Sequence, residues 1–368
     1  MSCKLIIIGN EILSGFTKET NSSFLIRELF EIGIKTTKIV FINDDINSIQ
    51  NEIDFDFNLI ILSGGLGPTS DDLTNEALAQ FFQQKPTSLI NNSIGTAPGV
   101  NYFFKGVSII ALPGVPIELK KMFTDEVVPL LVKEKRDLTN FLQVNVIGVH
   151  ESKLIKLLAN FESNKNINVS MSYLPENVVV KLRFFSSSIN FEDQFDLVKF
   201  DLKNILGHSI FSFKKESFEG FINKFLLKNK ITVSVAESCT GGYLSYLLTS
   251  FSNSSLFFRG SVCVYSNAAK TKVLNISKEL IKDKTAVSKE VAIQMAEKVK
   301  DKFNSDFSLS TTGYIDSNVS EDLFGIVWIA CSTSDKTITK MLKLSSDRKT
   351  NIIAVSRLSL NLLREQII

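Results

Sequence analysis

The sequence contains few of the residue types on which many active sites depend. Only two histidines occur in 368 residues, so histidine-based catalysis and histidine-rich metal sites are nearly excluded. The four cysteines lie far apart and form no C-x-x-C pair, which argues against a zinc ribbon or a disulfide scaffold. A nucleophile in this chain therefore needs an activating base other than histidine.

Long apolar runs and a strong excess of one charge are also missing. No run of about 18 apolar residues is present, so we expect no membrane span and no membrane partner. The first ten residues lack the hydrophobic region and cleavage site of a signal peptide and predict a β-strand, from which we expect a cytoplasmic protein. The net charge of +2 does not favour direct nucleic-acid binding.

Length and hydrophobic periodicity predict an α/β protein with three parts. A chain of 368 residues accommodates two or three domains, and we place them at residues 1–140, 141–212 and 213–368. In the first part, buried strands alternate with helices, which predicts a doubly wound parallel sheet. The predicted strands are residues 4–8, 38–42, 59–62 and 107–112, and the predicted helices are residues 21–32, 45–53, 75–82 and 118–132.

The two remaining parts differ in their order of elements. Residues 141–212 follow a β-α-β-β-α pattern, which predicts a small α+β domain with a mixed or antiparallel sheet. Residues 213–368 again alternate strands with helices and predict a second doubly wound α/β domain. This last part includes a long amphipathic helix over residues 288–303 and a closing helix over residues 349–364.

A glycine-rich loop over residues 63–74 (SGGLGPTSDDLT) is the first candidate site. It follows a buried strand and precedes a helix, which in an open α/β sheet is where ligands bind. Glycines let backbone N–H groups approach phosphate oxygens, and the adjacent carboxylates Asp71 and Asp72 would suit a divalent cation. A tight turn with an N-capping aspartate would explain the same pattern.

Other loops are expected at the same edge of this sheet. Residues 9–13 and 113–116 each follow a predicted strand, and residues 95–99 are expected to line the same cleft. Each loop is a weak signal alone, but doubly wound folds bring such loops together on one rim. Asp44 and Asp45 follow another predicted strand, where they would also suit a helix cap.

Residues 237–242 (ESCTGG) form the second candidate site, again between a strand and a helix. Ser238 is expected near a helix N-terminus, where backbone donors and the helix dipole favour an oxyanion. The simpler alternative is that Ser238 and Thr240 cap the helix, with Cys239 an inert packed thiol.

A serine nucleophile at this position needs a base. No histidine follows His208, so the available activators are Lys270 and Tyr265, both in the segment YSNAAK at the end of another predicted strand. A lysine serves as a base when burial lowers its pKa. We therefore expect any catalysis here to depend on the pairing of Ser238 with one of these two residues.

The motifs of the chain, in this order, resemble those of the CinA family, also called competence/damage-inducible protein A. The resemblance covers essentially the whole chain. The first part contains GNEIL, SGGLGPTSDDLTNEAL, GTAPG and LPGVPIELKKMF and is similar to the family's molybdopterin-binding-like domain, whose fold resembles that of the MoaB and MogA proteins. The middle part resembles the family's KH-type linker domain, but it has no clear G-x-x-G clamp, which does not favour nucleic-acid binding.

The resemblance implies a first function in the N-terminal part. There the family carries out metal-dependent hydrolysis of the pyrophosphate in ADP-ribose. Asp72 matches the acidic residue of the glycine loop, and Asp44 is the expected second acidic partner of a divalent metal ion. The glycines expected to bind substrate are Gly64, Gly65, Gly67 and Gly114.

The resemblance implies a second function in the C-terminal part, which contains VAESCTGG, YSNAAK, TAVSKEVAIQMAE and TTG. This part resembles the family's nicotinamide-nucleotide amidohydrolase domain, which converts nicotinamide mononucleotide to nicotinate mononucleotide and ammonia and needs no cofactor. Ser238 would be the nucleophile, with Tyr265 and Lys270 assisting. The family further implies a homodimer that acts on small-molecule nucleotides in pyridine-nucleotide salvage. The residues expected to bind substrate are Thr240, Gly241, Gly242 and Gly313, with Arg348 meeting the phosphate.

Two segments depart from the family pattern. In the family a Gly- and Pro-rich loop follows the TG motif, whereas here Tyr314 and Ile315 follow it, and we expect these larger side chains to crowd the pocket. The connection formed by residues 83–94 is shorter than in the family, which would remove part of a cleft wall or a dimer contact. Two other hypotheses therefore stay open. One is a catalytically degenerate nucleotide-binding or regulatory protein linked to competence or the DNA damage response; the other is a molybdopterin-handling protein, by analogy with the first fold.

Overall fold

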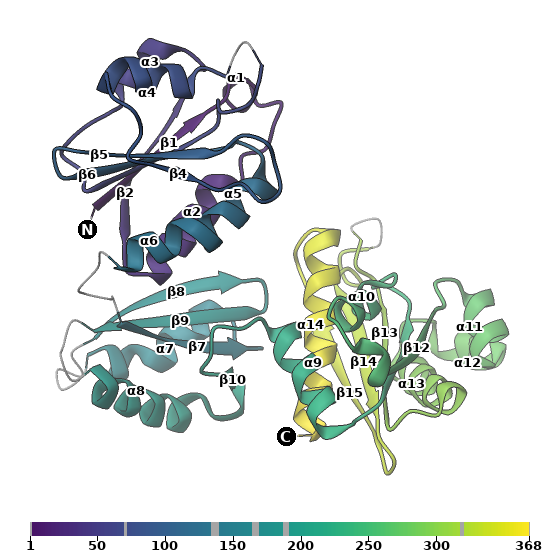
Figure 1. The fold of residues 1–368 in the computed structure, drawn as a ribbon. Helices are drawn as coiled ribbons and strands as arrows, with labels where there is room; N and C mark the ends of the chain where they lie inside the picture. The colour runs from purple at the N-terminus through teal and green to yellow at the C-terminus, as the bar shows by residue number, and fades with distance from the viewer. Residues whose placement is uncertain are drawn as a thin grey trace. The chain divides into compact units, whose positions relative to one another are not determined.

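Three β-sheets organise the chain, and helices pack against each of them (Figure 1). The computed structural model describes residues 2–69, 72–133, 140–163, 169–186, 191–316 and 320–367. The chain divides into two compact units, Met1–Asn140 and Phe141–Ile368. The first unit contains one sheet, and the second contains two.

The N-terminal unit is built on a six-stranded sheet with helices on both faces. The strands lie in the order β2-β1-β3-β6-β5-β4, and the first four are parallel. Helices α3 and α4 cover one face, and α2, α5 and α6 cover the other (Figure 1). The bounds are β1 Ser2–Ile8, α1 Asn10–Leu13, α2 Asn21–Glu31, β2 Lys35–Ile42, α3 Ile46–Asn51, β3 Leu59–Ser63, α4 Thr74–Phe82, β4 Ser88–Ile90, β5 Gly99–Phe104, β6 Val107–Leu112, α5 Pro116–Met122, a π-helical turn Phe123–Val127 and α6 Val128–Lys133.

Continuously apolar strands explain why helices cover both faces of this sheet. Successive side chains of a strand point to opposite faces, so an apolar run needs a cover on each side. Leu5 of β1 packs with Leu25 of α2, whereas the next residue, Ile6, packs with Ile49 of α3 in a separate core. The buried strands thus hold the two helical layers in place.

The prediction of a fully parallel sheet was wrong at one edge. β4 and β5 run antiparallel, and both lie in a stretch for which no strand was predicted. A two-residue turn at Lys105 and Gly106 joins β5 to β6, and its positive φ angles of 50° and 81° suit an antiparallel connection. Gly99 opens β5 where a Cβ atom would lie 2.7 Å from the carbonyl oxygen of Ala111.

The middle part of the chain forms a four-stranded sheet in the order β10-β7-β9-β8, with α7 and α8 on one face (Figure 1). β10 pairs antiparallel with β7, and β8 pairs antiparallel with β9. The predicted β-α-β-β-α pattern is present, and β10 follows it to give the order of a split β-α-β fold. The KH-type assignment is not confirmed. The bounds are β7 Asn140–Ile147, α7 Glu151–Glu162, β8 Ser170–Glu176, β9 Val179–Ser186, α8 Phe191–Leu206, a 3-10 turn Gly207–Ser209 and β10 Ile210–Ser212.

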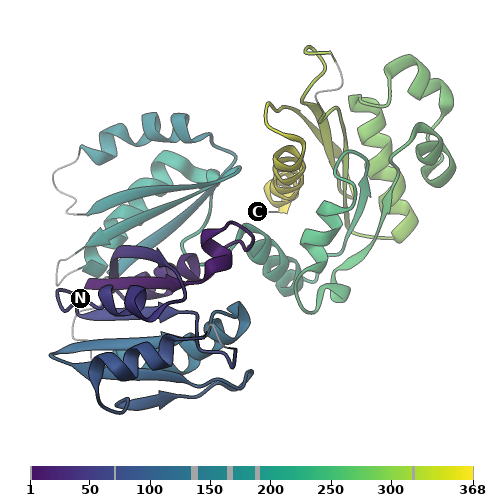
Figure 2. The ribbon, with the colours of Figure 1, turned by 90° about the horizontal axis from the view of Figure 1, so that it is seen from above.

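The last sheet has five strands in the order β12-β11-β13-β14-β15. β12, β11 and β13 are parallel, as predicted, whereas β14 and the unpredicted β15 are antiparallel. Figure 2 shows α14, in yellow, on one face of this sheet and α13, in light green, on the other. The bounds are α9 Phe218–Asn229, β11 Val233–Glu237, α10 Tyr243–Thr249, a 3-10 turn Ser254–Leu256, β12 Phe258–Cys263, α11 Asn267–Leu274, α12 Lys278–Lys284, α13 Lys289–Phe303, β13 Phe307–Gly313, β14 Ile326–Ser332, β15 Thr337–Lys343 and α14 Arg348–Ile367.

Both α/β sheets carry their loops of interest at the carboxyl ends of parallel strands. In the N-terminal unit, β1, β3 and β6 are followed directly by Gly9, Gly64 and Pro113; in the last sheet, β11 is followed by Ser238. This is the edge at which open α/β sheets bind ligands. In the part of the chain that the structure describes, we find no helix of the length and apolarity needed to span a membrane.

A buried arginine joins the middle sheet to the last one. Arg357 of α14 donates from Nε to Glu219 of α9 at 2.7 Å and from Nη2 to Glu176 of β8 at 2.9 Å. The side chains of Arg357 and Glu219 are only 12% and 9% exposed. Because a buried charge that loses its partner is costly, removing either partner alone is expected to destabilise the second unit.

We predict that Arg357→Leu lowers the free energy of unfolding by about 3–5 kcal/mol, because it leaves the Glu219 carboxylate buried and unpaired. The fluorescence of Trp328, the only tryptophan, reports unfolding of the last sheet in urea. The double variant Arg357→Leu/Glu219→Leu should regain most of the loss. Lys199→Leu, which breaks an exposed pair with Asp196, is the control and should cost under about 0.5 kcal/mol. Equal effects of Arg357→Leu and Lys199→Leu would contradict the account.

Candidate active sites

A serine and a lysine meet at the end of β11. Lys270 Nζ, from α11, donates to Ser238 Oγ at 2.9 Å and to the carbonyl oxygens of Val264 and Tyr265 at 3.0 and 3.4 Å. Lys270 is 2% exposed and Ser238 is 7% exposed. The structure thus brings together the predicted nucleophile and one of its two predicted activators.

Burial favours the neutral form of Lys270, because it lowers the pKa of the amine below the ordinary 10.5. A neutral amine has a lone pair with which to accept the serine proton. Burial has the opposite effect on the neighbouring Cys239, whose pKa it raises to about 12, so that thiol stays protonated.

The backbone at Ser238 is held by a buried carboxylate that the sequence analysis did not single out. Glu237, 1% exposed, accepts hydrogen bonds from the N–H groups of Gly242, Leu244 and Ser245 and from the hydroxyl of Ser245. These donors include the first N–H groups of α10, which have no partner within the helix. Glu237 therefore fixes the turn between β11 and α10.

The turn leaves few N–H groups for a ligand. The N–H of Gly241 donates to Ser238 O, that of Gly242 to Glu237, and that of Ser238 to Thr311 O. Among the described residues, the N–H groups of Cys239 and Thr240 donate to no backbone carbonyl in the turns and loops. These two N–H groups are thus the candidate donors of the turn for an oxyanion. Gly241 and Gly242 allow the turn itself, since their φ angles are +60° and +101°.

The hydroxyl of Thr240 contacts that of Thr311 on β13 at 2.7 Å. This bond links the turn to the neighbouring strand. Gly313, at the end of β13, is required by packing, because a Cβ atom there would lie 2.5 Å from Val327 Cγ2. The predicted substrate-binding residues Thr240 and Gly313 therefore both have a structural task beside the site.

The loop after Gly313 differs from the expectation in the placement of the Ile315 side chain. Ile315 is 3% exposed and belongs to the hydrophobic core of the last sheet, so its side chain does not fill a pocket. Tyr314 donates its N–H to Ile326 O and accepts from Gly325 N–H. The rest of the departing loop, residues 317–319, lies outside the described residues.

Tyr265 and Arg348 lie at the rim of this site. Tyr265 is 59% exposed, and its hydroxyl accepts a hydrogen bond from Arg348 Nη2 at 2.7 Å. Arg348 Nη1 also donates to Asp316 Oδ2 at 3.2 Å. The predicted phosphate-binding cation is therefore connected to Tyr265, whose carbonyl oxygen accepts from Lys270.

We predict that the stability conferred by Lys270 depends on pH. Its pKa is lowered in the folded protein, so between that pKa and 10.5 the unfolded chain binds more protons and folding is favoured as pH rises. The free energy of unfolding of the wild type minus that of Lys270→Met should therefore increase from pH 7 to pH 10, as measured by Trp328 fluorescence in urea. Lys272→Met, which removes an exposed lysine from the same helix, is the matched control. A difference that is constant with pH would contradict this account of the buried amine.

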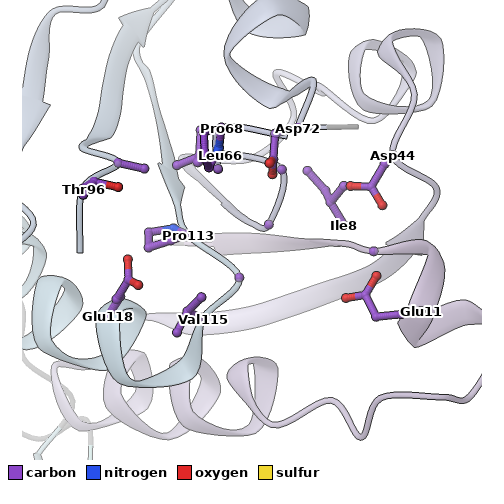
Figure 3. Close-up of a pocket in the computed structure, with 16 residues that line it drawn as sticks. Ile8, Glu11, Asp44, Leu66, Pro68, Asp72, Thr96, Pro113, Val115 and Glu118 are labelled. Atoms are coloured by element: carbon purple, nitrogen blue, oxygen red, sulfur yellow. The ribbon is translucent and has the colours of Figure 1, made fainter. Parts of the chain in front are cut away.

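A cavity of about 460 Å³ lies at the carboxyl edge of the N-terminal sheet. It is lined by the predicted loops after β1, β3 and β6 and by residues 96 and 97. In the view of Figure 3, Asp72 and Asp44 flank Ile8 at one side, whereas Thr96 and Glu118 lie toward the other. The expected convergence of these loops on one rim is thus present.

Two positions in the loop that lines this cavity require glycine, both because neighbouring atoms leave no room for a Cβ atom and because the backbone φ is positive. Gly64 has a φ of +117°, and a Cβ atom there would lie 2.3 Å from the carbonyl oxygen of Ile8. Gly65 has a φ of +65° and leaves space for the hydroxyl of Thr74. The loop is therefore pressed against β1 and α4, with Gly64, Gly65, Gly67 and Gly114 all lining the cavity.

The two predicted metal ligands line the same cavity but are held separately. Asp72 accepts hydrogen bonds from the N–H and the hydroxyl of Thr69. Burial alone would raise the pKa of Asp72, but these bonds and one from Gly67 lower it overall, so the carboxylate is ionised at neutral pH. Asp44 accepts from Asn10 N–H at 2.9 Å, while Asp45, not Asp44, caps α3.

The donor set of the cavity suits a hard divalent cation that keeps water and phosphate ligands. The described residues contain no cluster of three histidine, cysteine or carboxylate side chains, so they form no closed metal cage. Magnesium-type ions are usually held by one or two carboxylates together with substrate phosphates. Asp72 and Asp44 fit that arrangement, and Asp71 lies outside the described residues.

Two further carboxylates belong to loops that were expected at this rim, although no role was predicted for them. Glu11 and Glu118 both line the cavity, and Glu118 accepts from Asn92 Nδ2 at 2.7 Å. Asn92 also binds Gly95 N–H and Ala97 O, so it ties the 95–99 loop to α5. Glu118 lies in the first turn of α5, just after the loop 113–116.

Two family models match the chain. One, described as the CinA C-terminal domain, matches residues 215–367, and the other, described as "Probable molybdopterin binding domain", matches residues 4–133. The crystal structure of a competence-damaged protein (CinA) superfamily protein from Enterobacter cloacae is 28% identical over 42% of this chain and 95% of that chain, with a TM-score of 0.40.

Relatives are similar over the full length. A CinA-like protein of Cytophaga hutchinsonii is 32% identical over 99% of this chain and 97% of its own length. A CinA-like protein of Amoebophilus asiaticus is 30% identical over 100% of this chain and 99% of its own length. These full-length relatives, together with the two family models that match, show that the chain belongs to the CinA family.

Proposed function

We propose that the C-terminal domain is an amidohydrolase that converts nicotinamide mononucleotide to nicotinate mononucleotide and ammonia. The observation that carries the proposal is the 2.9 Å hydrogen bond between the buried amine of Lys270 and Ser238 Oγ. A serine becomes a nucleophile when a base lies within hydrogen-bond reach. The substrate class is what the family resemblance implies for this domain, and the half-exposed Arg348 at the rim suits its phosphate.

In the first step, Ser238 Oγ attacks the carboxamide carbon of the substrate while its proton passes to the neutral amine of Lys270. The carbonyl oxygen becomes an oxyanion, for which we assign the N–H groups of Cys239 and Thr240 as donors. The C–N bond then breaks, and the proton on Lys270 passes to the leaving nitrogen, which departs as ammonia. The product of this step is an ester on Ser238.

In the second step, water attacks the ester carbonyl and gives a proton to Lys270. The bond between the acyl carbon and Ser238 Oγ breaks, and Lys270 returns its proton to Oγ. Nicotinate mononucleotide leaves with its new carboxyl group, which ionises in solution. The cycle thus consumes one water and restores both side chains, with Lys270 neutral before each proton transfer.

We predict that Ser238→Ala lowers the rate of ammonia release from nicotinamide mononucleotide by at least about 10³-fold, because no other nucleophile is in place. The measurement is an enzyme-coupled ammonia assay on the full chain. Ser261→Ala, in an exposed position on β12, is the matched control and should keep wild-type activity. Ammonia release by Ser238→Ala within tenfold of the wild type would contradict the proposal.

A second activity is favoured by the cavity in the N-terminal domain. We propose that it hydrolyses the pyrophosphate of ADP-ribose with a divalent metal ion held by Asp72 and Asp44. When bound, such an ion neutralises phosphate charge and acts as a Lewis acid. The glycine loop supplies room for phosphate oxygens beside the backbone, and the two carboxylates supply hard oxygen donors.

We predict that Asp72→Asn and Asp44→Asn each weaken magnesium or manganese binding at least tenfold, because each removes one anionic ligand. Isothermal titration calorimetry measures metal affinity directly, and ADP-ribose hydrolysis should fall in parallel. Asp56→Asn, which lies in an exposed position outside the cavity, is the control for the change in charge. Unchanged metal affinity in both variants would contradict the assignment.

A further inference from the structure

Arg348, the first residue of α14, is a cation that already has an anionic partner. Its Nη1 donates to Asp316 Oδ2 at 3.2 Å, and its Nη2 donates to the Tyr265 hydroxyl at 2.7 Å. The side chains of Arg348 and Asp316 are 40% and 42% exposed. The ion pair therefore lies at the solvent boundary, where a ligand from solution can reach both charges.

This ion pair is connected to the buried serine through two residues, Tyr265 and Lys270. The hydroxyl of Tyr265 binds Arg348, and the carbonyl oxygen of the same tyrosine accepts from Lys270, which donates to Ser238. A ligand whose reacting amide lies at Ser238 would thus have its far end near the rim. An anionic far end would meet the guanidinium of Arg348 there.

At that point a phosphate and Asp316 would compete for the same donors. A guanidinium offers its N–H groups to a carboxylate or to a phosphate with similar geometry. An exposed ion pair contributes little stability, so a phosphate can displace Asp316. The displaced carboxylate stays close by, however, and its negative charge repels the phosphate.

We propose that Asp316 is a specificity-determining residue, whose carboxylate competes with the phosphate of a mononucleotide for Arg348 and so reduces the preference for nucleotide over nucleoside. The proposal rests on the proposed amidohydrolase function of this site. Asp316 has no part in bond making, because the reacting pair is Ser238 with Lys270. Its effect is therefore on substrate affinity and not on the chemical step.

We predict that Asp316→Asn lowers KM for nicotinamide mononucleotide between about two- and fivefold with kcat unchanged, as expected for loss of one exposed charge competition. KM for the corresponding nucleoside, which lacks the phosphate, should not change. Asp316→Glu, which restores the carboxylate, should return KM toward the wild-type value. Asp335→Asn, in an exposed turn away from Arg348, controls for the change in net charge.

A binding measurement separates this proposal from the amidohydrolase function. Ribose 5-phosphate is titrated into the full chain by calorimetry, which needs no turnover. Its affinity should rise in Asp316→Asn by the same two- to fivefold, and the gain should vanish when Arg348→Gln is added. A gain in affinity without any ammonia release would support the competition at Arg348 while excluding the amidohydrolase.

Three results would overturn the proposal. KM for the mononucleotide would rise in Asp316→Asn if the carboxylate served to orient Arg348 for phosphate. An equal change for nucleotide and nucleoside would place the effect away from the phosphate. An unchanged affinity for ribose 5-phosphate would mean that Asp316 does not compete at all.

Discussion

The C-terminal site depends on a lysine that is buried without a carboxylate partner. Among the described residues, Lys270 forms no ion pair, and its amine contacts a serine hydroxyl and two carbonyl oxygens. Burial disfavours the charged ammonium and lowers the pKa of Lys270. The lysine loses the hydration that stabilises an exposed ammonium, but its amine becomes available as a base. The turn that carries Ser238 must also be held in place opposite this amine. Glu237 holds the turn by accepting hydrogen bonds from three of its N–H groups.

The two proposed sites lie at the same edge of their α/β sheets, but their loops are built differently. In the N-terminal domain, glycines bring the backbone close to β1 and leave an open cavity edged by carboxylates, which suits a phosphate with a cation. In the C-terminal domain, N–H groups of the turn after β11 donate to a carbonyl of the same turn and to the Glu237 carboxylate. What it presents is a side chain, Ser238, against the amine of Lys270 from α11.

Sequence patterns predicted the features that depend on local chemistry. Buried strands followed by glycine turns identified both edges, and the absence of histidine after His208 left Lys270 and Tyr265 as the candidate activators of Ser238. Features that depend on distant partners were missed. β5 pairs with β6 through a Lys105–Gly106 turn without strong strand signals, and Ile315, two residues after the end of β13, packs in the core. The roles assigned to Glu237 and Asp316 depend on their contacts with α10 and with Arg348, and no local sequence pattern reveals these contacts.

The central claim is that Ser238 carries the acyl group during amide hydrolysis. The most direct test is mass spectrometry of the peptide containing Ser238, after acid quench of the full chain in single-turnover reaction with nicotinamide mononucleotide. The account predicts a transient increase in mass on Ser238 that equals nicotinate mononucleotide less one water. An adduct on any other residue, or complete ammonia release while Ser238 stays unmodified at every time point, would contradict it.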